Sequence, residues 1–338
     1  MKLHKMFTAV LAVGMLWSCQ TDDNSENNPE NVESSTTVSK NFNGTSIEVI
    51  PMGNGVYRNG DMLFRESQFL PKNASTKIPA PDDDTKLAVG GGVQKWTDNT
   101  VAYVIDPSLS STVQSELAKS FEEWSTRTNV QFKERTNESN FVTIAPAAGF
   151  IPEFADCNCG VANLGMNGDQ GFILLGAATT EPVITHEIGH TLGFIHEQNR
   201  ADRDQFINVN FENIQPQGRD QYFVDRFSTP LTDQVDFNSI MMYRSSTFSI
   251  DPTSGNFPTM TRRDTGAPVQ GLGDNLTDQD IVGTNNLYPA IADNGADCTG
   301  VAEYNPNVRY RNGDKVTFQG DLYEAINFRF VNQGPCRN

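Results

Sequence analysis

Between residues 96 and 192, apolar positions form two kinds of pattern, helical spacing and short continuous runs. In the first helix that we expect, they fall on one helical face: Val113, Leu117, Phe121 and Trp124. Ser110 or Ser111 can cap this helix, and a second helix is expected to carry Val183–Leu192. Other apolar runs have the length and composition of strands: Val101–Ile105, Val130–Phe132, Phe141–Ile144 and Gly171–Leu175. Strands interleaved with long helices predict an α/β or α+β unit with a mixed, twisted sheet, and we take it as α+β.

The two ends of the chain do not share this pattern. Residues 20–46 are rich in Asn, Ser, Glu and Thr, so we expect a flexible tether there. Residues 47–86 carry short apolar clusters and end in Pro79–Lys86, which is typical of an exposed, cleavable linker. A break near Ala290–Gly295 precedes a short β-rich tail. The expected divisions are 1–18, 19–86, 87–290 and 295–338.

The first 18 residues predict export. A positive start is followed by the short apolar run Met6–Trp17, which is typical of a signal peptide and not of a membrane span. Leu16–Cys19 also resembles a bacterial lipobox, in which Cys19 becomes the lipidated first residue. An ordinary cleaved signal with an incidental cysteine is the alternative. Either way we expect a secreted or outer-surface bacterial protein.

Charge and cysteine content narrow the partners. Acidic residues outnumber basic ones 42 to 25, which argues against a nucleic-acid surface. In an oxidising compartment the four cysteines beyond Cys19 suggest disulfides. Cys298 and Cys336 are the natural pair, and their bridge would be worth about 4 kcal/mol in the loop-entropy model. Cys157 and Cys159 could close a tight ring, remain free or cross-pair.

The chemistry-bearing motif is the run His186–Arg200. On a helix, His186 and His190 lie one turn apart on the same face, so both imidazoles can reach a single ion. Gly193 can adopt a positive φ, which lets the chain leave the helix and bring in His196. Three protein ligands leave one position open for water, which is typical of catalytic zinc. Glu187 is then placed to take and pass a proton as general base and acid.

Isolated histidines are usually surface or satisfied core residues, and two of them at helical spacing often occur by accident. Here the chain has four histidines in all, and every one outside the signal peptide belongs to the motif. Five specified residues at fixed spacing therefore favour zinc over an incidental arrangement.

The extended motif resembles the metzincins, and within them the astacin family. The third histidine is followed by a characteristic set of charged residues: Glu197, Arg200, Asp202, Arg203 and Asp204. Ser239–Tyr243 resembles the family's Met-turn, which implies that Met241 packs under the zinc and that Tyr243 stabilises the oxyanion. The resemblance runs from about Leu87 to Pro289 and implies a zinc-dependent endopeptidase acting on proteins or peptides.

The same resemblance implies a substrate strand and shows departures. Gln170–Leu175 is expected to be the edge strand that pairs with an extended substrate. Met242 stands where the family usually has His, and Asn129 stands where it usually has a disulfide cysteine. The Cys157–Cys159 pair replaces a longer-range bridge. These departures affect the disulfides and pockets but leave every catalytic role filled.

Members of this family are made as precursors. By resemblance, an activating protease would cut after Lys86, and the new amino terminus at Leu87 would fold towards Glu197. Family propeptides silence zinc with an aspartate, and Asp61 in Arg58–Asp61 is the nearest match; a plain Asn-Gly turn is the alternative. If Cys19 carries lipid, this cut would release the enzyme from the membrane.

The function of the tail and that of the whole chain each have two possible interpretations. Residues 310–325 resemble small carbohydrate-binding modules, with Tyr304 and Phe328 in the places of exposed tryptophans, and imply a polysaccharide partner; a disulfide-stapled β appendage is the alternative. A surface binding lipoprotein that has kept the shell without hydrolysis is the rival to an enzyme. The presence of Glu187, which binding alone does not need, favours the enzyme.

Overall fold

The computed structural model describes residues 37–69, 86–90, 93–271, 273–291, 298–306, 308–326 and 329–336. The chain forms two compact units, residues 1–289 and 290–338, which we describe separately. Within the described ranges, no helix has both the length and the apolar character needed to cross a membrane. The amino-terminal region with Cys19 lies outside the described residues.

Both expected helices are present in the first unit. Helix α1 spans Ser111–Arg127 and begins at Ser110, whose side chain accepts a hydrogen bond from Val113 N. Helix α2 spans Glu181–Leu192, and all its residues from 183 onward are buried. The indole of Trp124 donates to Thr185 O at 3.1 Å, which ties the two helices together.

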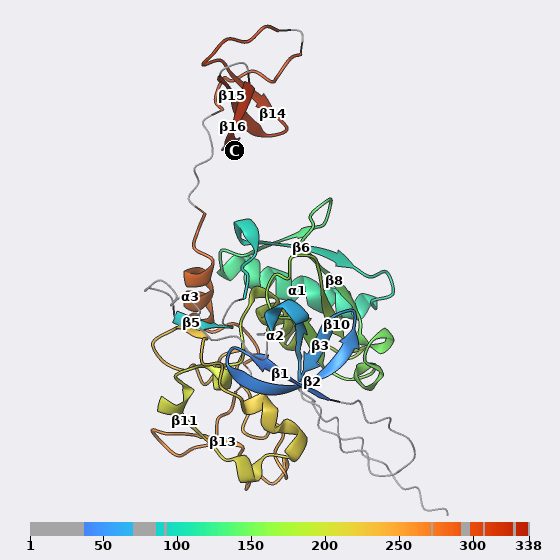
Figure 1. Cartoon of the computed structure of the whole chain (residues 1–338), viewed down its shortest axis with the longest axis vertical. Helices are drawn as coiled ribbons and strands as arrows, with labels where there is room; N and C mark the ends of the chain where they lie inside the picture. Colours follow the sequence, from blue (N-terminus) through green and yellow to red (C-terminus); the bar gives the residue numbers. More distant parts are fainter. Residues whose placement is uncertain are drawn as a thin grey trace, which may run out of the picture. The chain divides into compact units, whose positions relative to one another are not determined.

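A nine-stranded mixed sheet carries these helices, with the order β1-β2-β3-β4-β9-β10-β8-β6-β7 (Figure 1). In chain order its strands are β1 (Val38–Phe42), β2 (Thr45–Gly53), β3 (Val56–Asn59), β4 (Met62–Arg65), β6 (Thr100–Ile105), β7 (Gln131–Glu134), β8 (Phe141–Pro146), β9 (Gly160–Asn163) and β10 (Gln170–Leu175). Strands β6, β7, β8 and β10 fall on the runs that the apolar pattern predicted, and they pair in parallel. The α+β architecture with a mixed sheet is confirmed.

The expectation that Gln170–Leu175 forms the edge of the sheet is wrong. Strand β10 lies inside the sheet, between parallel β8 and antiparallel β9. The missed strand β9 is short and contains two small residues, Gly160 and Ala162, so its apolar signal is weak. In the catalytic region, β9 is therefore the outermost strand on this side, and β4 pairs with it.

The expectation of a flexible tether as far as residue 46 is also wrong from residue 37 onward. Strands β1 and β2 pair around the turn Asn43-Gly44, and their inward positions alternate with polar ones. Phe42, Ile47 and Val49 are almost completely buried. We call residues 37–69 the N-terminal segment; its four strands extend the sheet of the catalytic region.

The rest of the first unit consists of short elements. Strand β5 (Lys86–Val89) pairs with β12 (Thr229–Leu231), and β11 (Ile207–Val209) pairs with β13 (Met260–Arg262). Helix α3 spans Asp278–Leu287. Eight single-turn or short 3₁₀ helices are described: Glu66–Gln68, Thr97–Asn99, Ala147–Gly149, Pro152–Phe154, Glu197–Asn199, Arg203–Gln205, Phe211–Asn213 and Pro216–Tyr222. Most of the expected linker, residues 70–85, lies outside the described residues.

The second unit is the small β module that the tail predicted. It contains the antiparallel strands β14 (Lys315–Phe318), β15 (Asp321–Ile326) and β16 (Arg329–Pro335). A disulfide joins Cys298 to Cys336, as expected. Among the alternatives for the other cysteines, the structure has the bridge between Cys157 and Cys159.

Candidate metal centre

Helix α2 and the turn after it present three imidazoles to one point. His186 and His190 lie on the same helical face, and the helix ends at Gly193, whose φ is 104°. A side chain at Gly193 would also come within 2.8 Å of Val93, so both the backbone conformation and the space favour glycine. The chain then turns back and places His196 beside the other two rings. This local geometry agrees with the prediction from the motif.

Asp61 lies among the three imidazoles, at the tip of the turn between β3 and β4. Its Oδ2 is 3.2 Å from His196 Nε2 and 3.4 Å from His186 Nε2, and its Oδ1 is 3.6 Å from His190 Nε2. The two imidazole nitrogens of His186 and His196 are 3.3 Å apart. Ligands about 2.0–2.1 Å from one tetrahedral zinc ion lie roughly 3.3–3.4 Å from one another, which these separations match.

Unsatisfied polar atoms support the same interpretation. Within the part of the chain that the structure describes, His190 Nε2 and Asp61 Oδ1 are buried and have no hydrogen-bond partner. Buried polar atoms without partners are costly, and a shared metal ion would satisfy both. The four side chains therefore fit one zinc ion, with three neutral nitrogens and one carboxylate oxygen as ligands.

Backbone carbonyls fix the orientation of two rings. His186 Nδ1 lies 2.7 Å from Ile240 O, and His190 Nδ1 lies 2.8 Å from Phe194 O. Because each Nδ1 donates to a carbonyl, each Nε2 is left as the metal-facing lone pair. The motif itself does not reveal Ile240, which comes from a distant loop.

Burial and mutual electrostatic interactions shift the pKa values of Asp61 and the histidines. Burial disfavours a charged His186, but the hydrogen bond and negative charge of Asp61 outweigh it and raise its pKa to about 9. Burial lowers the pKa of His190 to about 4. Burial also opposes ionisation of Asp61, but the neighbouring histidines, His196 first, hold its pKa well below its usual range.

The remaining predicted residues of the site lie close to this cluster. Glu187 is fully buried, and its side chain packs so close to Gly160 of β9 that a Cβ there would be 2.6 Å from Glu187 Cγ. The ring of Tyr243 packs against that of His196 at a tilt of 47°, with centroids 4.3 Å apart, and its hydroxyl is 3.5 Å from Asp61 Oδ2. Met241 packs beneath helix α2, with its sulfur against Gly189.

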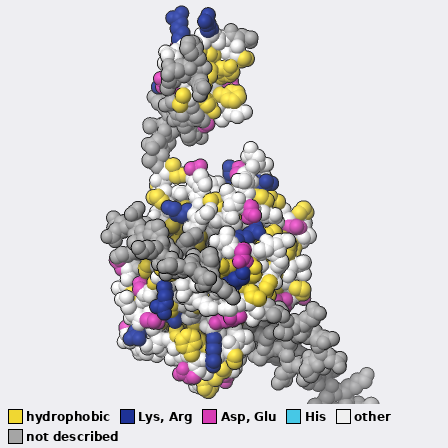
Figure 2. Space-filling model, viewed as in Figure 1, with side chains coloured by type: hydrophobic (Ala, Val, Ile, Leu, Met, Phe, Trp, Pro, Cys, Tyr) yellow, Lys and Arg dark blue, Asp and Glu magenta, His cyan; other side chains and the backbone are white. Residues whose placement is uncertain are grey.

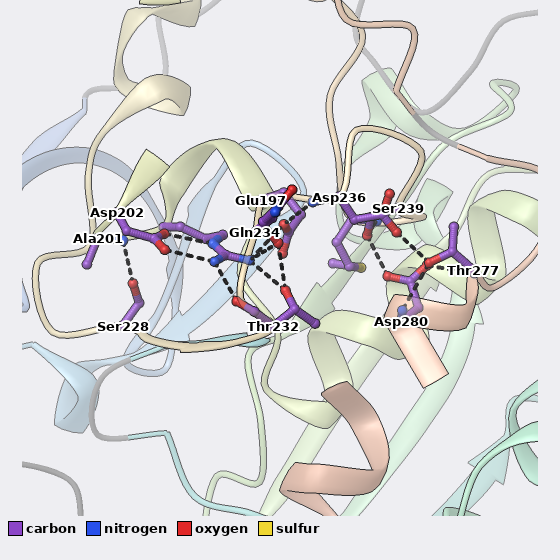
Figure 3. Close-up of polar contacts among 12 residues, drawn as sticks. Glu197, Ala201, Asp202, Ser228, Thr232, Gln234, Asp236, Ser239, Thr277 and Asp280 are labelled. Carbon is purple, nitrogen blue, oxygen red and sulfur yellow. Dashed lines mark hydrogen bonds and ion pairs between the residues drawn. The ribbon is translucent and has the colours of Figure 1, made fainter. Parts of the chain in front are cut away.

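A polar network around Glu197 follows the last histidine of the motif in the chain (Figure 3). Glu197 Oε2 accepts from Arg200 at 3.2 Å and from Asp236 N at 3.0 Å. Burial raises the pKa of Glu197 to about 7, although the charge of Arg200 opposes this shift. In this form of the protein, Glu197 is thus held by its own chain, and its contact with a new amino terminus stays a prediction.

The sequence interpretation missed Asp280 in helix α3. Its carboxylate accepts from Ser239 Oγ at 2.6 Å and from Ile240 N at 3.1 Å (Figure 3). It therefore holds Ile240, the residue whose carbonyl orients His186. The local signal was the capping box formed by Thr277 and Asp280, which marks a helix start but does not indicate a link to the metal site.

Comparison with known proteins identifies the family of the chain that carries this site. The family described as Astacin (Peptidase family M12A) matches residues 89–289. The chain belongs to the astacin family. Zinc is accordingly the metal for the centre formed by the three histidines and Asp61.

Several astacin-family relatives resemble the chain over most of its length. Flavastacin of Elizabethkingia meningoseptica is 29% identical over 81% of this chain, which spans 61% of that protein. Astacin-like metalloprotease toxin 1 of Loxosceles intermedia is 30% identical over 68% of this chain and 79% of its own. A solved structure of high choriolytic enzyme 1, a hatching enzyme zinc-protease from Oryzias latipes, matches with 25% identity and a TM-score of 0.50. That match covers 59% of this chain and 94% of the fish protein.

Proposed function

We propose that this chain is an exported, zinc-dependent endopeptidase that is made as a zymogen and cuts protein or peptide substrates. The observation that carries the proposal is the convergence of three histidines from α2 and its turn on one point, with Glu187 beside it. The relatives whose names include the word metalloprotease support the same activity.

The residues around the zinc divide the work of peptide hydrolysis. Zinc, when bound, acidifies water and polarises the scissile carbonyl. Glu187 accepts a proton from the attacking water and returns it to the leaving amine. The hydroxyl of Tyr243 lies 3.5 Å from the Asp61 carboxylate. Once Asp61 has left, the substrate's carbonyl oxygen takes that place, and the hydroxyl donates to it.

In the mature enzyme, the edge of β9 that β4 no longer covers orients the substrate. An extended peptide adding to this strand would pair through its backbone and lie across Gly160, directly against Glu187. In the precursor, β4 occupies this edge: Ala162 N donates to Asp61 O at 2.9 Å, and Leu164 N donates to Leu63 O at 3.0 Å. The N-terminal segment therefore acts as the propeptide, and it blocks both the metal and the substrate strand.

Cleavage near Lys86–Leu87 is the first step that converts the zymogen to the enzyme. Strand β5 begins at Lys86, so the backbone on the amino-terminal side of the cut leads back towards the propeptide. After the cut, Leu87 becomes the new amino terminus and can turn towards Glu197, whose neighbours would have to rearrange. A trypsin-like protease suits the lysine and is the expected activating partner.

Export follows from the signal-like start, and anchoring follows from Cys19 if it carries lipid. In that case activation frees the enzyme from the outer surface, because the lipid stays on the propeptide.

Lys and Arg side chains are scattered among acidic ones on the face in Figure 2, in keeping with a protein that does not bind nucleic acid.

The second unit is a candidate polysaccharide-binding module. Hydrophobic side chains gather on one side of it in Figure 2. An aromatic cluster contains the exposed Tyr304, Phe318 and Phe330 and the half-buried Tyr310, and the ring centroid of Tyr304 is 5.4–6.1 Å from each of the other three. Aromatic faces of this kind stack on sugar rings. Tyr304→Ala should weaken retention on insoluble polysaccharide, whereas Val308→Ala, at an exposed aliphatic residue of the same unit, should not. Phe328 lies outside the described residues.

The central test of the proposal is Glu187→Gln in the clipped protein after its propeptide has been separated, with Glu138→Gln as a control on the surface of the same unit. We expect cleavage of casein to fall by roughly 10²–10⁴-fold for the first and to remain unchanged for the second, since only Glu187 handles the proton. Zinc content should stay stoichiometric in both. An active Glu187→Gln enzyme, or cleavage that a chelator leaves intact, would contradict the mechanism.

Latency through Asp61 has a separate test. In the uncut precursor, Asp61→Ala removes the fourth ligand, so hydrolysis of a short peptide should rise above that of the natural precursor. Glu66→Gln is the control, because Glu66 pairs with Lys40 inside the propeptide. Equal latency of the Asp61→Ala and natural precursors would show that the carboxylate is not the zinc switch.

A further inference from the structure

The N-terminal segment makes contacts of its own with the catalytic region. Its last described residue, Phe69, is buried, and the next described stretch starts at Lys86. The proposed activating cut lies at that second point. Cutting there removes one covalent connection and breaks none of the contacts that the segment makes through residues 37–69.

Apolar contacts join the segment to the catalytic region in a continuous cluster. Its members from the segment are Phe42, Ile47, Val49, Met62, Phe64 and Phe69. Its members from the catalytic region include Leu164, Ile195 and Phe223, and all are at most 8% exposed. Separation of the two parts would expose both faces of this cluster to water, which opposes dissociation.

Polar contacts at the same interface are buried and well paired. Asn43 Nδ2 donates to Asp225 Oδ2 at 3.0 Å, and both residues are buried. Thr45 Oγ1 donates to Val224 O at 2.8 Å, at the same end of the segment. At the other end, Gln68 Nε2 donates to Leu164 O at 3.0 Å. The segment is therefore held at both ends as well as by the β4–β9 ladder.

From these contacts we infer that the N-terminal segment is an inhibitor subunit that stays bound after the activating cut and binds the enzyme as a second chain. This inference rests on the proposed proteolytic function. A single cut then yields a silent two-chain complex, and activity appears only when the segment is removed by a second event. Loss of the linker lowers the effective concentration of the segment, so the complex opens upon dilution.

The experiment uses the full chain from residue 20 with one engineered protease site placed directly before Leu87, so that cutting leaves Leu87 as the amino terminus. After complete cutting, size-exclusion chromatography and native mass spectrometry report whether the fragment containing residues 37–69 co-elutes with the enzyme. We expect a one-to-one complex with precursor-like activity. Dilution, or mild denaturant followed by separation, should raise the specific activity by roughly tenfold or more.

Two matched variants test the interface itself. Asn43 and Asn54 both occupy left-handed positions of Asn-Gly turns, with φ of 50°, and aspartate tolerates that backbone. Asn43→Asp places a second carboxylate against Asp225, so the cut segment should dissociate. Asn54 is exposed, so Asn54→Asp should retain the segment like the natural protein.

The outcomes separate the inference from the function on which it rests. A cut natural protein whose segment elutes alone, or a co-eluting complex with full activity, would overturn the inference. Equal retention of the two Asp variants would also contradict it. If the separated enzyme stays inactive with zinc bound, the proteolytic assignment fails, whereas co-elution, measured by mass, still decides whether the segment remains bound.

Discussion

The four groups that meet at the zinc centre come from two regions with opposite design. The three histidines lie within the continuous run His186–His196, on a buried helix and the turn that ends it. Asp61 lies 135 positions before His196, on a hairpin of the N-terminal segment. The first region is built by local backbone geometry, whereas the second is brought in by strand pairing and long-range packing. The histidines are therefore fixed by the catalytic region itself, whereas the position of Asp61 depends on the packing of the N-terminal segment.

The largest effect is expected for a substitution at the turn that positions His196. Gly193→Ala forces a left-handed alanine and a contact with Val93, which should destabilise the fold by about 2–4 kcal/mol and displace His196. Activity and zinc affinity of the mature enzyme should both fall. Gly168→Ala is the control, because it has a φ of 84° with nothing within 4 Å. Thermal unfolding and zinc titration compare the two, and unchanged zinc affinity in Gly193→Ala would refute this account of the turn.

An intermediate effect breaks the aspartate side at the corresponding place. Gly60 has a φ of 60°, and a Cβ there would overlap the side chain of Gln221. Gly60→Ala should therefore shift the tip of the hairpin and pull Asp61 from the histidines. The uncut precursor should hydrolyse a short peptide roughly tenfold faster. After removal of the propeptide its kcat/KM should equal that of the natural enzyme; a defect that persists would mean that the two sides are not separable.

The smallest expected effect concerns ionic contacts on the aspartate side. Arg58 pairs with Glu153 at 2.9 Å, and the glutamate side chain is 58% exposed. Such a pair is worth about 0–1 kcal/mol and is screened by salt. Glu153→Gln should raise the basal activity of the precursor by less than about fivefold, and added salt should reduce the difference. A complete loss of latency would show that we underestimate this contact.

Sequence reasoning was most reliable where the structure is local. The helix over Val113–Trp124 and the helix carrying the motif follow from apolar spacing, and the turn at Gly193 follows from the freedom of glycine. Asp61 was predicted by resemblance to a propeptide motif with a plain turn as its alternative. The structure contains both features, because the Asn-Gly turn is what presents Asp61 to the histidines.

The errors concern strands and their neighbours. The strand Gln170–Leu175 was found, but its position inside the sheet was not, because the apolar pattern of a strand does not specify which strands pair with it. Residues 37–46 read as polar tether because only alternate positions face the core, and those are few. The contribution of Asp280 was invisible for the same reason, since its target at Ile240 lies in another loop.

The amino-acid sequence alone determined that two imidazoles share a helical face, that a third follows a left-handed turn, and that a carboxylate stands beside them. These relations depend on backbone periodicity over a few residues. Only the tertiary structure decided that Asp61 lies among the three histidines, that β4 pairs with β9, and that Asp280 holds Ile240 behind His186. Those relations join segments far apart in the chain, and their geometry follows from how the sheet and core pack as a whole.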